Sequence, residues 1–166
     1  MHVEESLAAV ELVRRFDGPI VDVGSGGGAP GIPLAAALPD RQVTLLEANA
    51  RKCAFLEQAA RAFSNVRVLR GRAEEQETDR YGVAVAKALA PPPVAAEWCL
   101  PLVASGGAAI LFVGPSADLA AVERVAEHLA SGPPEHHGGM LVVPKLGPTP
   151  PGFPRRPGMA RKRPLA

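Results

Sequence analysis

Short apolar runs alternate with amphipathic segments along most of the chain. A strand that is covered on both faces of a sheet shows a continuous run of valine, isoleucine and leucine. Such runs predict strands over 20–23, 43–46, 66–69, 83–86, 108–113 and 141–143. Apolar residues at helical spacing between them predict helices over 4–16, 32–38, 51–63, 94–103 and 119–129. This alternation predicts an α/β fold with a doubly wound, mostly parallel sheet.

The composition fits one folded domain. The chain has 166 residues, of which 47% are hydrophobic but only 4% aromatic, so the core must consist mainly of alanine, valine and leucine. Cys53 and Cys99 show no zinc or disulfide spacing, and no apolar run approaches the roughly 20 residues of a membrane span. The first residues do not resemble a signal peptide. We therefore expect a cytoplasmic monomer with no metal and no membrane contact.

The formal net charge of +1 hides a strong local imbalance. From His136 onward the chain has no Asp or Glu, and seven prolines follow from Pro144. These features predict a folded domain over 1–143 and a basic, proline-rich extended tail over 144–166. Its basic residues are Lys145, Arg155, Arg156, Arg161, Lys162 and Arg163. The last five are candidates for RNA phosphate contacts, and the alternative is a tail that only improves solubility.

The first predicted strand runs directly into a glycine-rich loop, DVGSGGG, from Asp22 to Gly28. Glycines let the backbone turn tightly and approach a ligand with no Cβ in the way. Such a loop can place the pyrophosphate of a dinucleotide on a helix N-terminus. It can equally pack against the methionine part of S-adenosylmethionine (SAM), which has no phosphate. Asp22, two residues before Gly24, could then bind the ammonium group of SAM.

Two acids follow the next strands. Glu47 ends the second strand, where a carboxylate can accept hydrogen bonds from both hydroxyls of a ribose in either SAM or NAD. Glu74 follows the third strand and could accept from the exocyclic amine of an adenine. Each acid alone could be a solvated strand end or a helix N-terminus that favours negative charge. A nucleoside-type ligand is predicted by the order of these features along the chain: the glycine loop, then Glu47, then Glu74.

The loop and its continuation, DVGSGGGAPGIPL over 22–34, resemble the glucose-inhibited division protein B family of methyltransferases. The P-G-I-P continuation is more specific than the glycines. Other matches follow in chain order over nearly the whole sequence: VTLLE over 43–47, Arg51-Lys52 with Phe55-Leu56, Arg72-Ala73-Glu74, Lys87-Ala88 and FPRRPGMARKRPL from Phe153. The resemblance implies a Rossmann-like class I SAM-dependent fold and methylation of guanine N7 in small-subunit (16S) ribosomal RNA. Its partner would be this RNA or the small ribosomal subunit.

The resemblance also implies site residues. Family positions that contact SAM correspond to Gly24, Ala29, Ala73, Glu74 and Lys87. With the loop and strand ends added, the predicted cofactor-binding set is Asp22, Gly24, Ser25, Gly26, Gly28, Ala29, Glu47, Ala48, Ala73, Glu74 and Lys87. Lys87 is also the candidate catalytic residue, acting electrostatically beside the cofactor, and the alternative is a solvated lysine at a strand end.

The sequence departs from the family pattern at three places, and each departure predicts a structural difference. The family has several dozen more residues before the histidine that matches His2, so residues 1–17 would be the remnant of a helical cap. Lys87 stands where the family has arginine and lacks the planar fork of a guanidinium. The segment 131–139 is short and rich in proline, glycine and histidine, which predicts a sheet one edge strand short.

Guanine N7 carries a lone pair and no proton, so its methylation needs alignment rather than a base. We therefore assign no general base, and expect His2, His128, His136 and His137 to lie at the surface. Three other functions stay open: a small-molecule SAM methyltransferase, a NAD-dependent dehydrogenase and an inactive RNA-binding remnant. The basic tail disfavours the first, and Glu74 with the P-G-I-P sequence disfavours the second.

Overall fold

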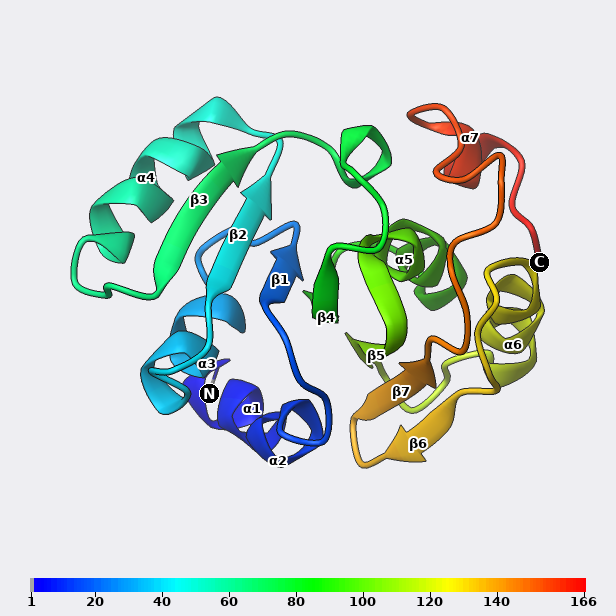
Figure 1. Cartoon of the computed structure of the whole chain (residues 1–166), viewed down its shortest axis with the longest axis horizontal. Coiled ribbons are helices and arrows are strands. Elements are labelled where there is room, and N and C mark those ends of the chain that lie inside the picture. The colour runs from blue at the N-terminus through cyan, green and yellow to red at the C-terminus, as the bar shows by residue number, and fades with distance from the viewer. Residues whose placement is uncertain (1) are drawn as a thin grey trace.

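The computed structural model describes residues 2–166, with side chains from residue 3 onward, and is built on one seven-stranded sheet (Figure 1). The strand order is β3-β2-β1-β4-β5-β7-β6. The first five strands along the chain pair in parallel, and β6 and β7 are antiparallel. The strands are β1 (Ile20–Val23), β2 (Val43–Glu47), β3 (Val66–Arg70), β4 (Tyr81–Lys87), β5 (Val103–Phe112), β6 (Glu135–His137) and β7 (Met140–Pro144). The predicted fold class and all six predicted strands are confirmed.

The helices cover both faces of this sheet. They are α1 (His2–Ala8), α2 (Val10–Val13), α3 (Gly31–Ala37), α4 (Ala50–Ala60), α5 (Pro92–Cys99), α6 (Leu119–His128) and α7 (Met159–Lys162), with short 3₁₀ helices η1 (Ala73–Glu75) and η2 (Leu100–Leu102). Alternate strand residues point to opposite faces, so Val21 packs in the core with α5 and α6, whereas Ile20 packs with α2 and α3. Alanine, valine and leucine make up most of both cores, as the composition predicts.

The edge of the sheet corrects one expectation. We predicted a missing strand over 131–139, but Glu135–His137 forms β6 and pairs with β7 through Glu135 opposite Val142 and His137 opposite Met140. An edge strand needs only one partner, and charged side chains protect its open side from pairing with other chains. A polar edge strand therefore has no apolar run by which the sequence could show it.

Three predicted helices end early or are divided in the structure. The helix predicted over 51–63 ends at Ala60. The apolar spacing over 4–16 is divided between α1 and α2. The helix predicted over 94–103 ends at Cys99 because Pro101 has no N–H to donate and its ring clashes with the preceding turn. The chain then passes through η2 and enters β5 at Val103.

The C-terminal segment, residues 145–166, folds back onto the domain. It runs from β7 past α5 to α7, which lies at the same end of the molecule as the loop after β3 (Figure 1). Lys145 is 1% exposed and donates to the carbonyls of Leu100 and Val103, and Ala160 of α7 is 3% exposed. The expectation of an extended tail is therefore wrong, because a buried lysine and a packed helix anchor the segment.

No helix within residues 2–166 has both the length and the apolar character needed to cross a membrane.

Candidate cofactor site

The loop after β1 is shaped by glycines in backbone conformations that most other residues adopt only with strain. Gly24, Gly26 and Gly28 have φ of +71°, +53° and +100°, in the left-handed region. A Cβ on Gly24 would collide with Cδ1 of Leu89, and one on Gly28 would lie 2.6 Å from Cδ1 of Ile32. The backbone at Gly24 and Gly28 therefore lies close to neighbouring side chains, and the loop forms one wall of a cavity.

Glu47 is held in place by the loop that it faces. Its Oε1 accepts from the N–H of Gly26 at 3.0 Å, and its Oε2 accepts from the N–H of Asn49 at 2.8 Å. The residue is only 8% exposed. Each carboxylate oxygen keeps a second lone pair, so both can still accept from a ligand hydroxyl. The geometry gives a fixed, charged acceptor at the end of β2, as the sequence predicts.

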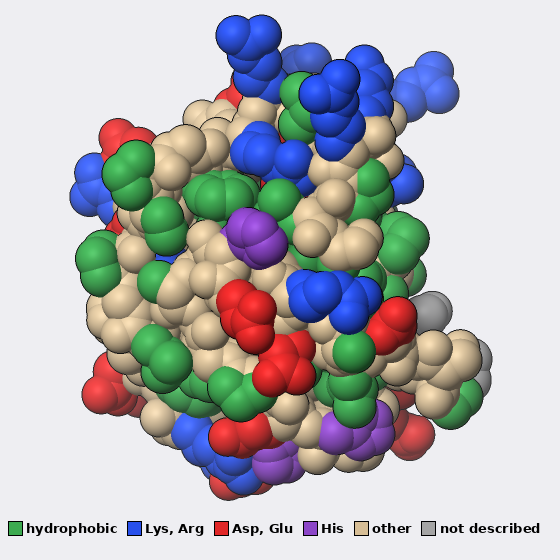
Figure 2. Space-filling model, turned by 90° about the vertical axis from the view of Figure 1, so that its right-hand side faces the viewer, with side chains coloured by type: hydrophobic (Ala, Val, Ile, Leu, Met, Phe, Trp, Pro, Cys, Tyr) green, Lys and Arg blue, Asp and Glu red, His purple; other side chains and the backbone are tan. Residues whose placement is uncertain are grey.

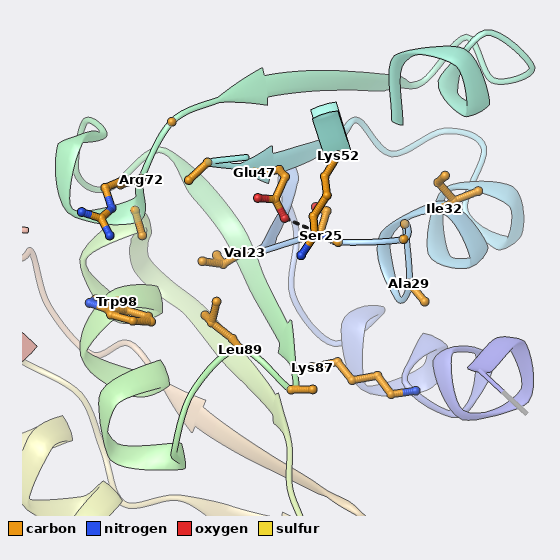
Figure 3. Close-up of a pocket in the computed structure, with 18 of the residues that line it drawn as sticks. Val23, Ser25, Ala29, Ile32, Glu47, Lys52, Arg72, Lys87, Leu89 and Trp98 are labelled. Carbon is orange, nitrogen blue, oxygen red and sulfur yellow. Dashed lines mark hydrogen bonds between the residues drawn. The ribbon is translucent and has the colours of Figure 1, made fainter. Parts of the chain in front are cut away.

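A cavity of about 820 Å³ opens at the carboxyl ends of β1, β2, β3 and β4. This volume falls within the range of small-molecule sites, and ligands of open α/β sheets bind at such strand ends. In Figure 3, Arg72 and Trp98 lie at one end, and Ala29, Ile32 and Lys87 lie at the other, with Glu47 between them. The predicted residues in its wall are Gly24, Ser25, Gly26, Gly28, Ala29, Glu47, Ala48, Ala73, Glu74 and Lys87.

Asp22 does not line this cavity. It is fully buried behind the loop, where its Oδ2 accepts from the N–H of Gly31 at 3.0 Å at the start of α3. Its Oδ1 has no hydrogen-bond partner in the described part of the chain. Burial raises the pKa of Asp22 to about 7, against the opposing effect of the Gly31 hydrogen bond. Asp22 therefore supports the loop from behind, and its contact with the cofactor stays a prediction.

The raised pKa of Asp22 makes stability depend on pH. An unfolded Asp ionises near its usual pKa, whereas the folded Asp22 stays protonated up to about pH 7, so its contribution to stability is lost as pH rises through that value. Asp22→Asn cannot ionise. We expect the free energy of unfolding of Asp22→Asn, relative to the parent, to rise by about 2–3 kcal/mol between about pH 5 and about pH 8. Urea unfolding at both pH values measures this difference, and a constant difference would contradict the assigned pKa.

Lys87 lies at the mouth of the cavity, where its side chain extends from the end of β4 toward α1 (Figure 3). Its Nζ forms an ion pair with Glu5 of α1 and lies 5.8 Å from the centre of the Phe112 ring. Val3 of the same helix also lines the cavity. The first helix is therefore part of the site, and it meets the residue for which we predicted an electrostatic role.

Glu74 lies at the opposite end, on η1 after β3. Its Oε2 accepts from the N–H of Gly158 at 3.0 Å, a residue of the C-terminal segment. Arg161 of α7 also lines the cavity and lies over the ring of Trp98, with 5.2 Å between the guanidinium carbon and the ring centre. Arg155 binds both carboxylate oxygens of Glu97, at 2.5 and 2.7 Å. A phosphate at Arg155 would therefore have to compete with Glu97.

Several cavity residues were not in the predicted set. They are Val3, Val23, Gly27, Ile32, Pro33, Lys52, Gly71, Arg72, Ala88, Leu89, Trp98 and Arg161. Trp98 is the only tryptophan of the chain, but it lies in a segment that the sequence shows only as an apolar helix. Arg161 was placed among the phosphate-binding candidates, because its approach to the cavity depends on how the C-terminal segment folds. In the described part of the chain, no cluster of His, Cys, Asp or Glu could hold a metal.

Sequence comparison identifies the family of this site. The family model described as "rRNA small subunit methyltransferase G" matches residues 1–132. The chain belongs to this family. A relative of the same name from a Synechococcus strain is 38% identical, over 99% of this chain and 73% of its own length. Another, from Salinispora tropica, is 45% identical over 82% of this chain and 62% of its own length. The match confirms the resemblance of the loop and strand ends.

Solved structures agree on the fold. A SAM-dependent O-methyltransferase from Thermotoga maritima superposes with a TM-score of 0.69 at 15% identity, over 86% of this chain and 65% of its own. TYW2 from M. jannaschii, solved with SAM bound, gives a TM-score of 0.67 at 16% identity, over 86% and 72%. At such identities the likeness shows the fold alone, which is that of the Rossmann-like SAM-dependent methyltransferases.

Proposed function

We propose that this chain methylates guanine N7 in small-subunit (16S) ribosomal RNA, with SAM as the methyl donor. The observation that carries the proposal is the carboxylate of Glu47, which the glycine loop fixes through Gly26 in the wall of a cavity whose far end holds a second acid, Glu74. Family membership supports the same activity and favours ribosomal RNA as the substrate. Such a substrate would be met in the cytoplasm.

The residues present fit SAM. Glu47 offers acceptors for the two ribose hydroxyls, and Glu74 offers one for the adenine amine. Gly24 and Gly28 carry no side chain, so a ligand in the cavity can approach their backbone closely. The remaining predicted contacts come from Ser25, Gly26, Ala29, Ala48, Ala73 and Lys87 in the cavity wall, with Asp22 behind it.

SAM, when bound, supplies a methyl carbon on a positively charged sulfur, which an unprotonated ring nitrogen such as guanine N7 can attack without a base. The protein's part is then orientation. Glu47 and Glu74 would hold the nucleoside half, and the glycine loop would hold the methionine half. Lys87, at the mouth, would provide a donor and positive charge for an acceptor oxygen of the incoming nucleotide, in competition with its ion pair to Glu5.

RNA would approach over the C-terminal segment. Arg156, Arg161, Lys162 and Arg163 are exposed, and basic side chains gather at the end of the molecule where Figure 1 places α7 (Figure 2). Phosphate contacts at such a patch give affinity that falls with salt rather than base choice. The patch favours RNA over a small molecule as the substrate.

The direct test is methyl transfer to undermethylated small ribosomal subunits and to naked 16S RNA, using labelled SAM and analysis of the nucleosides. We expect labelled 7-methylguanosine in at least one of the two substrates. A folded chain that binds S-adenosylhomocysteine but labels neither RNA would contradict the RNA substrate and leave the small-molecule alternative. A folded chain that binds no S-adenosylhomocysteine would contradict the cofactor.

Lys87→Met is expected to slow methyl transfer about 100-fold while the protein stays folded, because a donor and its charge are lost at the mouth of the cavity. Lys87→Arg keeps the charge, restores the family residue and should retain at least the parental rate. Single-turnover kinetics at saturating SAM would measure both rates. Equal rates for Lys87→Met and the parent would exclude a catalytic role for Lys87.

A further inference from the structure

The C-terminal segment contacts the cavity at two points that the proposed cofactor contacts do not include. Gly158 donates its N–H to Oε2 of Glu74, and Arg161 lies over Trp98 in the cavity wall. Both contacts lie at the end away from Lys87 (Figure 3 shows Trp98 there). This is the end at which Glu74 would meet the adenine amine, so the segment is placed to act on adenine recognition.

Gly158 determines where the carboxylate of Glu74 lies. The residue has φ of +84°, and its N–H donates to Glu74 in this left-handed conformation. Among the residues that the structure describes, Oε1 of Glu74 accepts no hydrogen bond, which leaves this oxygen for a ligand. A carboxylate fixed through one oxygen presents the other in a defined direction, as Gly26 and Asn49 do for Glu47.

The segment is held in register by contacts on both sides of Gly158. Arg155 binds the 4%-exposed Glu97 through two hydrogen bonds, and Glu97 precedes Trp98 on α5. Ala160 is buried, and Arg161 follows it and covers the Trp98 ring. A guanidinium on an aromatic face gains a cation–π interaction. The pair therefore lines this end of the cavity as two side chains in contact.

We propose that Gly158 and Arg161 are positioning residues for the adenine end of the cofactor site, Gly158 through Glu74 and Arg161 through Trp98. The inference rests on the proposed function, because it takes SAM as the ligand. It makes the C-terminal segment part of the cofactor site as well as an RNA-contacting surface. It predicts that changes in this segment alter which base the site accepts, not only how tightly it binds.

The test compares two ligands by calorimetric titration of the full chain: S-adenosylhomocysteine and S-inosylhomocysteine, in which an oxygen replaces the adenine amine. The parent should prefer the first, because Glu74 can accept from an amine but repels a carbonyl oxygen. Gly158→Ala adds a methyl group in open space but disfavours the left-handed backbone. We expect Gly158→Ala to bind S-adenosylhomocysteine roughly tenfold more weakly than the parent does. It should bind the inosine analogue with the same affinity as the parent.

Gly152→Ala is the matched control. Gly152 has φ of +91° and the same open space around it, but the hydrogen bond to Glu74 comes from Gly158. Its substitution should lower stability as Gly158→Ala does and leave the ligand preference unchanged. Gly158→Asn should keep most of the preference, since asparagine tolerates left-handed backbone. This variant also serves if Gly158→Ala does not fold.

Arg161→Met should weaken both ligands about fivefold, and Arg161→Lys should recover part of the loss, because a cation over Trp98 is restored. Arg124→Met, an exposed arginine of α6, controls for loss of charge and should bind as the parent does. If the parent binds S-adenosylhomocysteine but Gly158→Ala keeps the parental preference, or Arg161→Met keeps the parental affinities, the positioning role of that residue is wrong and the proposed function stands. If the parent binds neither ligand, the proposed function itself fails, and this inference fails with it.

Discussion

Replacing Glu47 with glutamine is expected to weaken the binding of S-adenosylhomocysteine by about 100-fold. Both carboxylate oxygens of Glu47 accept from backbone N–H groups, of Gly26 and of Asn49. A glutamine has one oxygen, so its NH₂ group must face one of these N–H donors. The substitution therefore disturbs the loop at Gly26 and also removes the charged acceptor that we assign to the ribose hydroxyls.

Calorimetric titration would measure this loss, with thermal unfolding to show that the variant is folded. Glu57→Gln, on the exposed face of α4, removes the same charge outside the cavity wall and should bind the ligand as the parent does. A folded Glu47→Gln protein with a Kd within about threefold of the parental value would mean that the carboxylate does not contact the ligand. The assignment of this cavity to SAM would then lose its main support.

The centre of the sheet could be predicted because its strands are buried on both faces. β1 and β2 have no exposed residue, and apart from Asp22, Thr44 and the acid that ends β2 their residues are apolar. β6 is the contrast: its three residues, Glu135–His137, are polar because the strand lies at the edge. An apolar pattern reflects the burial of side chains and not the pairing of backbones. An edge strand pairs with one neighbour while its side chains stay largely exposed.

The part of the site that is built from neighbouring strand–helix units could be predicted from the sequence. The part that depends on contacts between residues distant in the sequence could not. The glycine loop and Glu47 lie within the first two strand–helix units, and the hydrogen bond between Gly26 and Glu47 follows from the parallel pairing of β1 with β2. Arg161 reaches the cavity only because residues 145–160 fold back over α5. That course depends on single contacts such as Arg155 with Glu97, which no sequence period encodes.

Lys145 is a second case in which the sequence does not reveal a long-range contact, here for a charged residue. We counted it among the basic residues of a solvated tail, but its side chain is fully buried and its Nζ lies near four acceptors. They are the carbonyls of Leu100 (2.8 Å) and Val103 (2.6 Å), Oγ1 of Thr149 (2.7 Å) and Oδ1 of Asp79 (3.3 Å). Burial lowers the pKa of Lys145, and the charge of Asp79 opposes that shift.

Lys145→Met is expected to lower the free energy of unfolding by about 3–4 kcal/mol. Methionine fills a similar space but donates no hydrogen bond, so two backbone carbonyls and the carboxylate of Asp79 lose a buried partner. Urea unfolding would measure the loss. Lys52→Met, at an exposed lysine of α4, should change stability by no more than about 0.5 kcal/mol.

A double variant separates the charge pair from the packing. If Asp79 is destabilising once its partner is gone, then Asp79→Asn combined with Lys145→Met should cost less than the sum of the two single losses. Thr149, which binds both Asp79 and Lys145, begins the course of the C-terminal segment toward α7. Loss of Lys145 should therefore weaken the contacts at the start of the C-terminal segment, which carries Gly158 and Arg161 further on. Strictly additive losses in the free energy of unfolding, or a loss below about 1 kcal/mol for Lys145→Met, would mean that Lys145 does not anchor the start of the C-terminal segment.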